Sequence, residues 1–277
     1  MIRIVFLQTR DMLKRKESLL AFCILLILVL WNYIRNVFAF QGTDVIAMYH
    51  PMKLLLLSYN MTCYNADLTI LFIQLFPILV VCPAGFALAK EYQIGESIYV
   101  SARLGNDRYK MSKFMAVFAT TFIIFTVPFL IEMILNCLAF PLVATGDLSN
   151  WDAYDISYLN SVNNYIAPQF YREAPYLYSF MCVVLFGVFS GMLGVFTSVI
   201  SAVYKVKYNI FLFLPVYVFL NMFSMLSREK EKSLRWDDFM LLFNEVEKNT
   251  YVFMGIWIIF LVILAIGIIH TRKKDCL

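Results

Sequence analysis

The sequence has few charged residues for its length. Only 15% of its 277 residues are Asp, Glu, Lys or Arg, whereas soluble domains carry about 25%. Glycine and proline are also sparse, at 10 and 8 residues, which excludes collagen-like and low-complexity chains. Apolar residues take up the difference and make up 61% of the chain. A soluble domain could not bury so much apolar surface, so the composition predicts a membrane protein.

The sequence also lacks the residue patterns that catalysis and metal binding require. Its two histidines, His50 and His270, are far apart, and no His-Glu-x-x-His, Cys-x-x-Cys or Gly-x-Ser-x-Gly motif occurs. The Gly-x-x-x-x-Gly-Lys-Ser/Thr loop that binds the phosphates of ATP is missing as well. The six cysteines do not form a disulfide framework, because four of them fall within apolar runs. We therefore expect no enzymatic activity, no metal site and no cofactor in this chain.

The apolar residues gather into six runs, and a helix needs about 20 such residues to cross the bilayer core. The runs do not alternate with polar residues as the strands of a membrane barrel do. The sequence thus predicts an all-α polytopic membrane protein, with residues 1–277 forming one transmembrane domain. The six expected spans are residues 19–34, 68–89, 113–140, 176–203, 208–226 and 251–269.

The charges predict the orientation of these spans. Six crossings place both termini on one side, and that side holds fifteen of the 23 lysines and arginines. The positive-inside rule makes this side cytoplasmic, so we expect a multi-pass protein of the cell membrane with both termini in the cytoplasm. Because the orientation in the membrane accounts for the excess of basic residues, the positive charge does not indicate nucleic acid binding, and we expect no nucleic acid partner.

Residues 1–17 form a separate amphipathic stretch. Apolar residues such as Ile2, Val5 and Phe6 recur at helical spacing, whereas Arg3 and Arg10 occupy other positions. This pattern favours a helix lying in the cytoplasmic interface, with its cations near anionic lipid headgroups. The alternative is a positive flank that only orients the first span.

One ionisable residue lies well inside an expected span. Glu132 is in the outer half of the third span, and Asn136 follows four residues later on the same helical face. Intramembrane carboxylates are candidates for substrate or ion pathways, so Glu132 and Asn136 are candidate residues of a translocation path. The alternative is a structural hydrogen bond to a neighbouring helix.

The fourth span contains three glycines at helical spacing, Gly187, Gly191 and Gly194. Small residues in this pattern let two helices approach closely. Packing within the chain is the favoured interpretation, and a seam between two copies of the chain is the alternative.

The expected cytoplasmic loop between the second and third spans carries a family resemblance. It contains Glu91, Gly95, the apolar residue Ile98, then Arg103 or Arg108, and finally Lys113. This order is similar to the first cytoplasmic loop of the membrane subunits of type-2 ABC exporters, which also have an interfacial helix followed by six spans. The segments 75–83 and 138–141 resemble the same family, so motif-like similarity covers about residues 70–141.

The resemblance implies a function and partners. The loop would be a coupling helix that docks on a separate ATPase subunit, with Glu91, Gly95, Glu96, Ile98, Arg103 and Arg108 at the contact. That partner would bind ATP and Mg²⁺, and a second permease copy or paralogue would complete a dimer. We expect the export of a hydrophobic or peptide-like substrate by alternating access, with peptide export or self-immunity as the role.

Two expected outer loops complete this interpretation. Trp236, Phe239, Met240, Phe243 and Val246 recur at helical spacing and predict an amphipathic helix within 228–249. The loop 142–175 is rich in tyrosine and is longer than the resemblance leads us to expect. It is either an interfacial cap or a binding surface. The second possibility leaves open a membrane sensor or assembly factor that does not transport.

Overall fold

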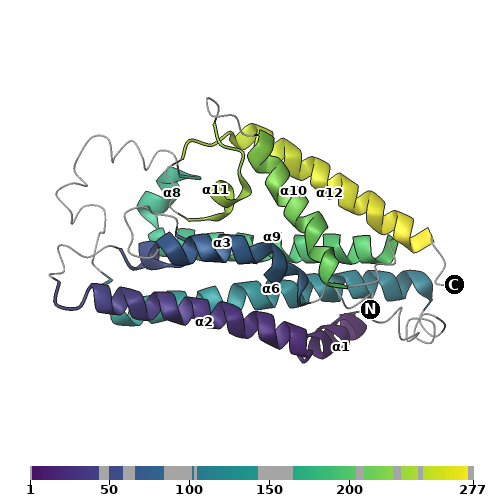
Figure 1. Ribbon diagram of the computed structural model, residues 1–277, viewed down its shortest axis with the longest axis horizontal. Coiled ribbons are helices and arrows are strands. Elements are labelled where there is room, and N and C mark those ends of the chain that lie inside the picture. The colour runs from purple at the N-terminus through teal and green to yellow at the C-terminus, as the bar shows by residue number, and fades with distance from the viewer. Residues whose placement is uncertain are drawn as a thin grey trace.

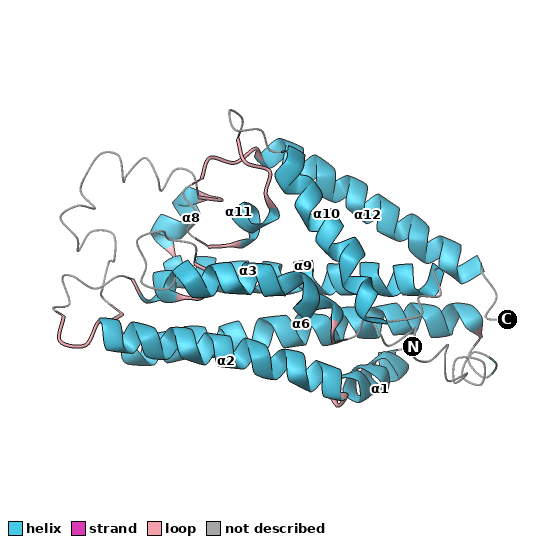
Figure 2. Ribbon diagram, viewed as in Figure 1, coloured by secondary structure: helices cyan, strands magenta, loops and turns pink. Residues whose placement is uncertain are grey.

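Helices account for 84% of the residues described by the computed structural model. These residues are 2–43, 50–58, 66–83, 102, 105–142, 165–203, 209–226, 232–242 and 246–273. Within these ranges there is no strand (Figure 2). Isolated bridges pair Ser58 with Leu242 and Ser233 with Lys248. The α-helices are α1 (Ile2–Leu13), α2 (Lys16–Ala39), α3 (Ala66–Val81), α6 (Asn106–Ala139), α8 (Pro168–Glu173), α9 (Pro175–Val203), α10 (Phe213–Leu226), α11 (Trp236–Met240) and α12 (Thr250–Lys273).

Four of these helices, α2, α6, α9 and α12, are long and apolar enough to cross a membrane. The chain is therefore a helical, membrane-embedded protein, and four of the expected spans correspond to helices that could cross the bilayer. The other two apolar helices are shorter: α3 has 16 residues and α10 has 14, or about 24 and 21 Å at 1.5 Å per residue. Six crossings therefore remain a prediction.

The boundaries of five spans differ from those expected by more than one residue. The third, expected over 113–140, begins at Asn106, and the sixth, expected over 251–269, extends from Thr250 to Lys273. The first, expected over 19–34, runs from Lys16 to Ala39, because polar residues in its last turns are buried against protein. The second ends at Val81 within the described residues, and its expected remainder, 84–89, lies outside them. The fifth was expected to begin at residue 208, but residues Asn209–Leu212 form a 3₁₀ turn before α10.

The core is built around α6 and α9. α2 packs against α6, α3 packs against α9, and α12 contacts α9. In Figure 1 the helices α2, α3, α6, α9, α10 and α12 run alternately in opposite directions, and α1 lies across the end of the bundle at which both termini are found.

Aromatic side chains join the central helices. Phe76 of α3 contacts Phe125 of α6, with ring centroids 5.6 Å apart, and Phe186 of α9 at 5.3 Å. It also stacks on Trp236 of α11 at 4.8 Å. These side chains are all buried, so edge and stacked ring contacts hold α3, α6, α9 and α11 together.

The three glycines of α9 face α6. A Cβ atom at Gly191 would lie 3.1 Å from the backbone oxygen of Phe118, and one at Gly194 would lie 2.7 Å from Oγ1 of Thr121. A Cβ atom at Gly187 would overlap the side chain of Thr126. The glycines thus permit close contact between two helices of the same chain.

Replacing Gly191 with alanine should destabilise this contact. The new methyl group would press against the Phe118 ring and backbone, and a backbone atom cannot swing aside. We expect the free energy of unfolding to fall by about 1–3 kcal/mol, measured as a lower thermal midpoint of the detergent-solubilised protein.

Gly255 of α12 provides the matched control, because a Cβ atom there meets nothing within 4 Å. Gly255→Ala should leave the midpoint unchanged or raise it slightly, since alanine favours a helix over glycine by about 1 kcal/mol. Equal losses in the two variants would contradict the explanation from close helix approach.

Candidate functional site

Four polar side chains are buried together near the C-terminal ends of α2 and α6. Asn32 and Asn36 project from α2, and Glu132 and Asn136 project from α6. Each is at most 2% exposed. Both pairs have a spacing of four residues, which places the two members of a pair on one face of their helix. The two faces meet across a segment of main chain that is not α-helical.

That segment is residues 50–58, which we call the inserted segment. It begins with a 3₁₀ turn over Pro51–Leu54, and all of its side chains are buried. Main chain without an α-helix is tolerated at membrane depth only where it is enclosed by protein, because each N–H and C=O group needs a partner. The polar side chains supply those partners.

The amide side chains of α2 and α6 bind carbonyl groups of the inserted segment. Nδ2 of Asn32 and Nδ2 of Asn36 each donate to the oxygen of Leu54 at 2.8 Å. Nδ2 of Asn136 donates to the oxygen of Pro51 at 3.3 Å. Two long helices, α2 and α6, therefore bind carbonyl groups of the same turn.

Glu132 binds the segment through an N–H group. Its Oε1 accepts hydrogen bonds from the backbone N–H of Leu56 at 2.8 Å and from Nδ2 of Asn32 at 2.6 Å. This carboxyl group thus connects α6, α2 and the inserted segment at one atom. Its Oε2, together with Oδ1 of Asn32 and of Asn136, is buried without a hydrogen-bond partner in the part of the chain that is described.

Two further elements fix the other end of the inserted segment. Oγ1 of Thr69 in α3 donates to the oxygen of Leu56 at 3.1 Å. The N–H of Leu242, just after α11, donates to the oxygen of Leu57 at 2.8 Å. The segment consequently ties α2, α3, α6 and the chain after α11 into one unit.

Sequence reasoning identified Glu132 and Asn136 but missed Asn32 and Asn36. The structure brings all four together, with Glu132 and Asn136 fully buried. A signal for the other pair was present: two asparagines four residues apart near the end of an apolar run repeat the spacing of Glu132 and Asn136. What the sequence could not indicate is the common partner, a stretch of main chain.

His50 caps the turn that starts the inserted segment. Its Nδ1 accepts a hydrogen bond from the N–H of Met52 at 3.2 Å, and its ring lies 4.9 Å from that of Tyr176. Burial, together with the positive charge of Lys53, lowers the pKa of His50 to about 4. The imidazole is therefore neutral at pH 7, as an acceptor at Nδ1 must be.

A hollow of about 490 Å³ lies between α9, α11 and α12. Its walls are apolar and aromatic, including Phe189, Phe253 and Trp257, and Lys248 also lines it. Burial lowers the pKa of Lys248 to about 8, although the nearby Asp238 opposes this effect. Nε1 of Trp257 is buried without a hydrogen-bond partner among the described residues. The hollow therefore combines apolar and aromatic walls with one cationic side chain, Lys248.

The expected coupling residues fall mostly outside the described residues. These are Glu91, Gly95, Glu96, Ile98 and Arg103. Arg108 is described and is exposed in the first turns of α6. Close to it, Lys110 is buried, and its Nζ donates to the oxygen of Thr271 in α12 at 2.5 Å. The beginning of α6 is thus attached to the last turns of α12, where backbone carbonyls lack helical partners and favour a cation.

The amphipathic helix expected within 228–249 is present in the described residues but is much shorter than its apolar spacing predicts. The helix α11 covers only Trp236–Met240, and the backbone is extended at Leu241. The reason is a tertiary contact: Leu242 uses its N–H to bind the inserted segment at Leu57, so this N–H cannot continue a helix. Trp236 and Phe239 are buried, in line with an apolar face turned toward the protein.

Comparison with known proteins does not identify a family for this chain. No family model matches the sequence, and no characterised protein and no solved structure is detectably similar to it.

Glu132 can be tested by substitutions that differ in hydrogen-bonding capacity. Glu132→Leu leaves the N–H of Leu56 and one N–H of Asn32 without an acceptor. Each unsatisfied buried donor costs about 1–3 kcal/mol, so we expect a loss of about 2–5 kcal/mol in the free energy of unfolding. Glu132→Gln keeps an acceptor oxygen and should lose distinctly less, as measured by thermal midpoints in detergent.

Thr197→Val is the control for this pair, because within the described residues the buried Thr197 hydroxyl bonds to the oxygen of Leu193 in its own helix and to no other element. It should change the midpoint little. If Glu132→Leu were as stable as Thr197→Val, the inserted segment would not depend on the carboxyl group.

His50 predicts a dependence of stability on pH. Because the folded-state pKa of about 4 lies below the ordinary value of 6.5, the unfolded chain binds a proton first as pH falls. The stabilisation is complete above about pH 6.5 and is lost as pH falls toward 4. We expect the wild-type thermal midpoint to drop between pH 7 and pH 5.

His50→Asn retains a capping acceptor and does not titrate. Its midpoint should therefore fall less over the same pH range. Identical pH profiles of the two proteins would assign the loss of stability to other groups.

Proposed function

We propose that this protein is the permease subunit of an ATP-driven ABC exporter, located in the cell membrane with both termini in the cytoplasm. It would pair with a separate ATPase that binds ATP and Mg²⁺, and with a second permease copy or paralogue. It would move a hydrophobic or peptide-like substrate by alternating access. This chain itself would carry no ATPase site.

The proposal is supported mainly by contacts among three helices at the beginning of α6. This is where α6 follows the expected cytoplasmic loop between the second and third spans, which we call the charged loop. α6 begins at Asn106, directly after the loop, and Lys110 in its second turn binds the end of α12. α1 packs on the same part of α6, where Met12 contacts a buried cluster that includes Phe114 and Val117. A displacement of the loop would therefore reach three helices at once.

The C-terminal end of α6 supports a role for this helix in transmitting movement from the charged loop to the inserted segment. This helix has 34 residues, about 50 Å at 1.5 Å per residue, and it carries Glu132 and the inserted segment at its other end. Pro128, one turn before Glu132, removes a hydrogen bond from the helix interior and would be a bending point. Movement applied to the loop could then alter the packing around the inserted segment.

The number of crossings and the orientation rest on two further observations. Both termini lie at one end of the molecule, and the six apolar helices alternate in direction (Figure 1). Fifteen of the 23 lysines and arginines belong to segments expected at that end, which favours the cytoplasmic side. An even number of crossings, six when α3 and α10 are included, agrees with this arrangement.

The hollow between α9, α11 and α12 supports the substrate class. Its aromatic walls suit an apolar or peptide-like molecule, and Lys248 at its wall suits a polar or acidic group on that molecule.

The test is a pull-down of the tagged chain in mild detergent, with ATPase activity measured on the eluate. We expect a nucleotide-binding subunit to co-purify with the wild-type chain. Glu91→Lys combined with Gly95→Arg should remove most of that activity, because bulky cations would disrupt the coupling contact.

The matched control is Glu247→Lys combined with Val246→Arg, which makes the same change of charge at exposed positions at the opposite end of the bundle. It should retain the ATPase. A chain that elutes alone under several gentle extraction conditions would contradict the permease and favour a sensor or assembly factor.

A further inference from the structure

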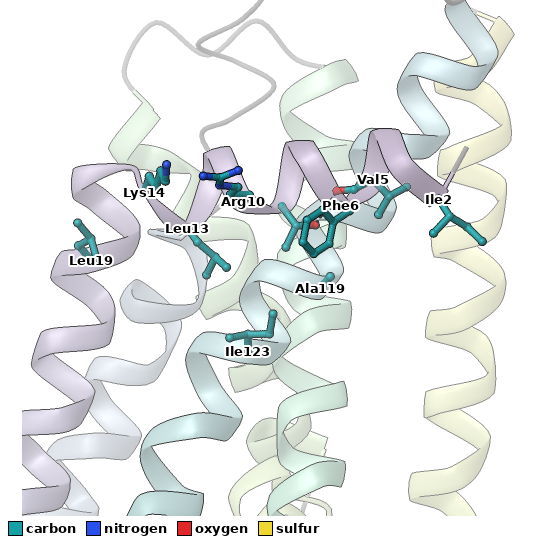
Figure 3. Close-up of a pocket in the computed structure, with 10 residues that line it drawn as sticks. Ile2, Val5, Phe6, Arg10, Leu13, Lys14, Leu19, Ala119 and Ile123 are labelled. Carbon is teal, nitrogen blue, oxygen red and sulfur yellow. Dashed lines mark hydrogen bonds between the residues drawn. The ribbon is translucent and has the colours of Figure 1, made fainter.

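An apolar groove of about 690 Å³ runs beneath α1. Its floor is formed by Ala119 and Ile123 of α6, and its sides by Leu13 of α1 and Leu19 of α2. Figure 3 shows the side chains of Phe6 and Leu13 pointing from α1 toward the same space as Ala119 and Ile123. Phe6 and Leu19 remain largely exposed, so α1 does not close the groove.

Two cations stand at the rim of this groove. Arg10 and Lys14 line it together with the apolar residues, and in Figure 3 their charged groups lie at the level of α1, away from Ile123. Both side chains are exposed, and neither forms an ion pair with a residue in the described part of the chain. The groove therefore has a charged rim and an apolar floor.

We infer that this groove binds an anionic phospholipid. The phosphate contacts Arg10 and Lys14, and one acyl chain lies along Leu13, Ala119 and Ile123. The inference does not depend on the proposed transport function.

The position of the groove selects a lipid over a protein segment. It lies beside the first turn of the spanning helix α2, where α1 crosses the end of the bundle, and this is the depth at which headgroups meet acyl chains. Leu19 lines the groove, and it and the next residue of α2, Leu20, are exposed and apolar, as expected of a surface in contact with lipid. Cations next to such a surface attract anionic headgroups.

A bound lipid would also have a structural consequence. It would fill the space between α1 and the N-terminal half of α6 and so hold α1 against that helix. Lipid composition would thereby influence the part of α6 that follows the charged loop.

Native mass spectrometry of the full chain, purified in mild detergent and incubated with equal amounts of phosphatidylglycerol and phosphatidylcholine, tests the proposal. The wild-type protein should retain phosphatidylglycerol preferentially. Arg10→Gln combined with Lys14→Gln should reduce this preference by about fivefold per cation removed. Soluble glycerol phosphate should not displace the lipid, because it lacks the acyl chain.

Two further variants distinguish specific binding of lipid in the groove from nonspecific attraction of anionic lipid to the cations of the N-terminal region. Arg3→Gln combined with Lys16→Gln removes the same charge from exposed positions that do not line the groove, and it should keep the preference. Ala119→Leu leaves every charge in place and fills the groove floor, and it should lose retained lipid. An equal loss in both cation pairs, or full retention in Ala119→Leu, would overturn the proposal.

Discussion

The main chain at residues 50–58 passes between the helices without forming an α-helix of its own, and the hydrogen bond from Leu56 to the buried Glu132 carboxyl group is central to holding it there. Without water, the N–H and C=O groups of this segment must find partners within the protein. Asn32, Asn36, Asn136 and Glu132 provide them. The relative positions of α2 and α6, and the course of the chain after α11, all follow from this requirement.

A second constraint acts at the opposite end of α6. There the helix is joined to α12 through Lys110 and to α1 through an apolar cluster, while the glycines of α9 hold its middle at close range. A helix fixed by polar contacts near both ends and packed tightly in between moves as a unit, apart from the turn weakened by Pro128. This is the mechanical basis of the proposed coupling between the charged loop and the membrane-embedded region.

From the sequence, Glu132 was a candidate for a translocation path, because ionisable residues in membranes are often functional, and a structural hydrogen bond to a neighbouring helix was the alternative. The hydrogen bonds of Glu132 support a structural role, because they anchor the inserted segment. This role is compatible with one in transport, since a rearrangement of α6 would disturb the same hydrogen bonds. The hollow beside α12 and the groove beneath α1 are separate from Glu132 and lie near opposite ends of the molecule. The two proposed sites for apolar molecules are therefore chemically different: one is aromatic and includes Lys248, and the other has an exposed cationic rim.

Periodicity and composition alone were enough to predict a helical membrane protein, four of its spanning helices and the amphipathic pattern of residues 2–13, because apolar runs and helical spacing are local properties of the chain. Glu132 and Asn136 were also identifiable, since a carboxylate in an apolar run stands out. The partner of these residues was not predictable, because main-chain groups look alike in every sequence and only the packing of α2 against α6 brings residues 50–58 to them. The same reason explains why the helix that was expected to continue beyond Met240 ends there. Its apolar spacing was correct, but the N–H of Leu242 was already bonded to Leu57, a contact that only the tertiary structure decides.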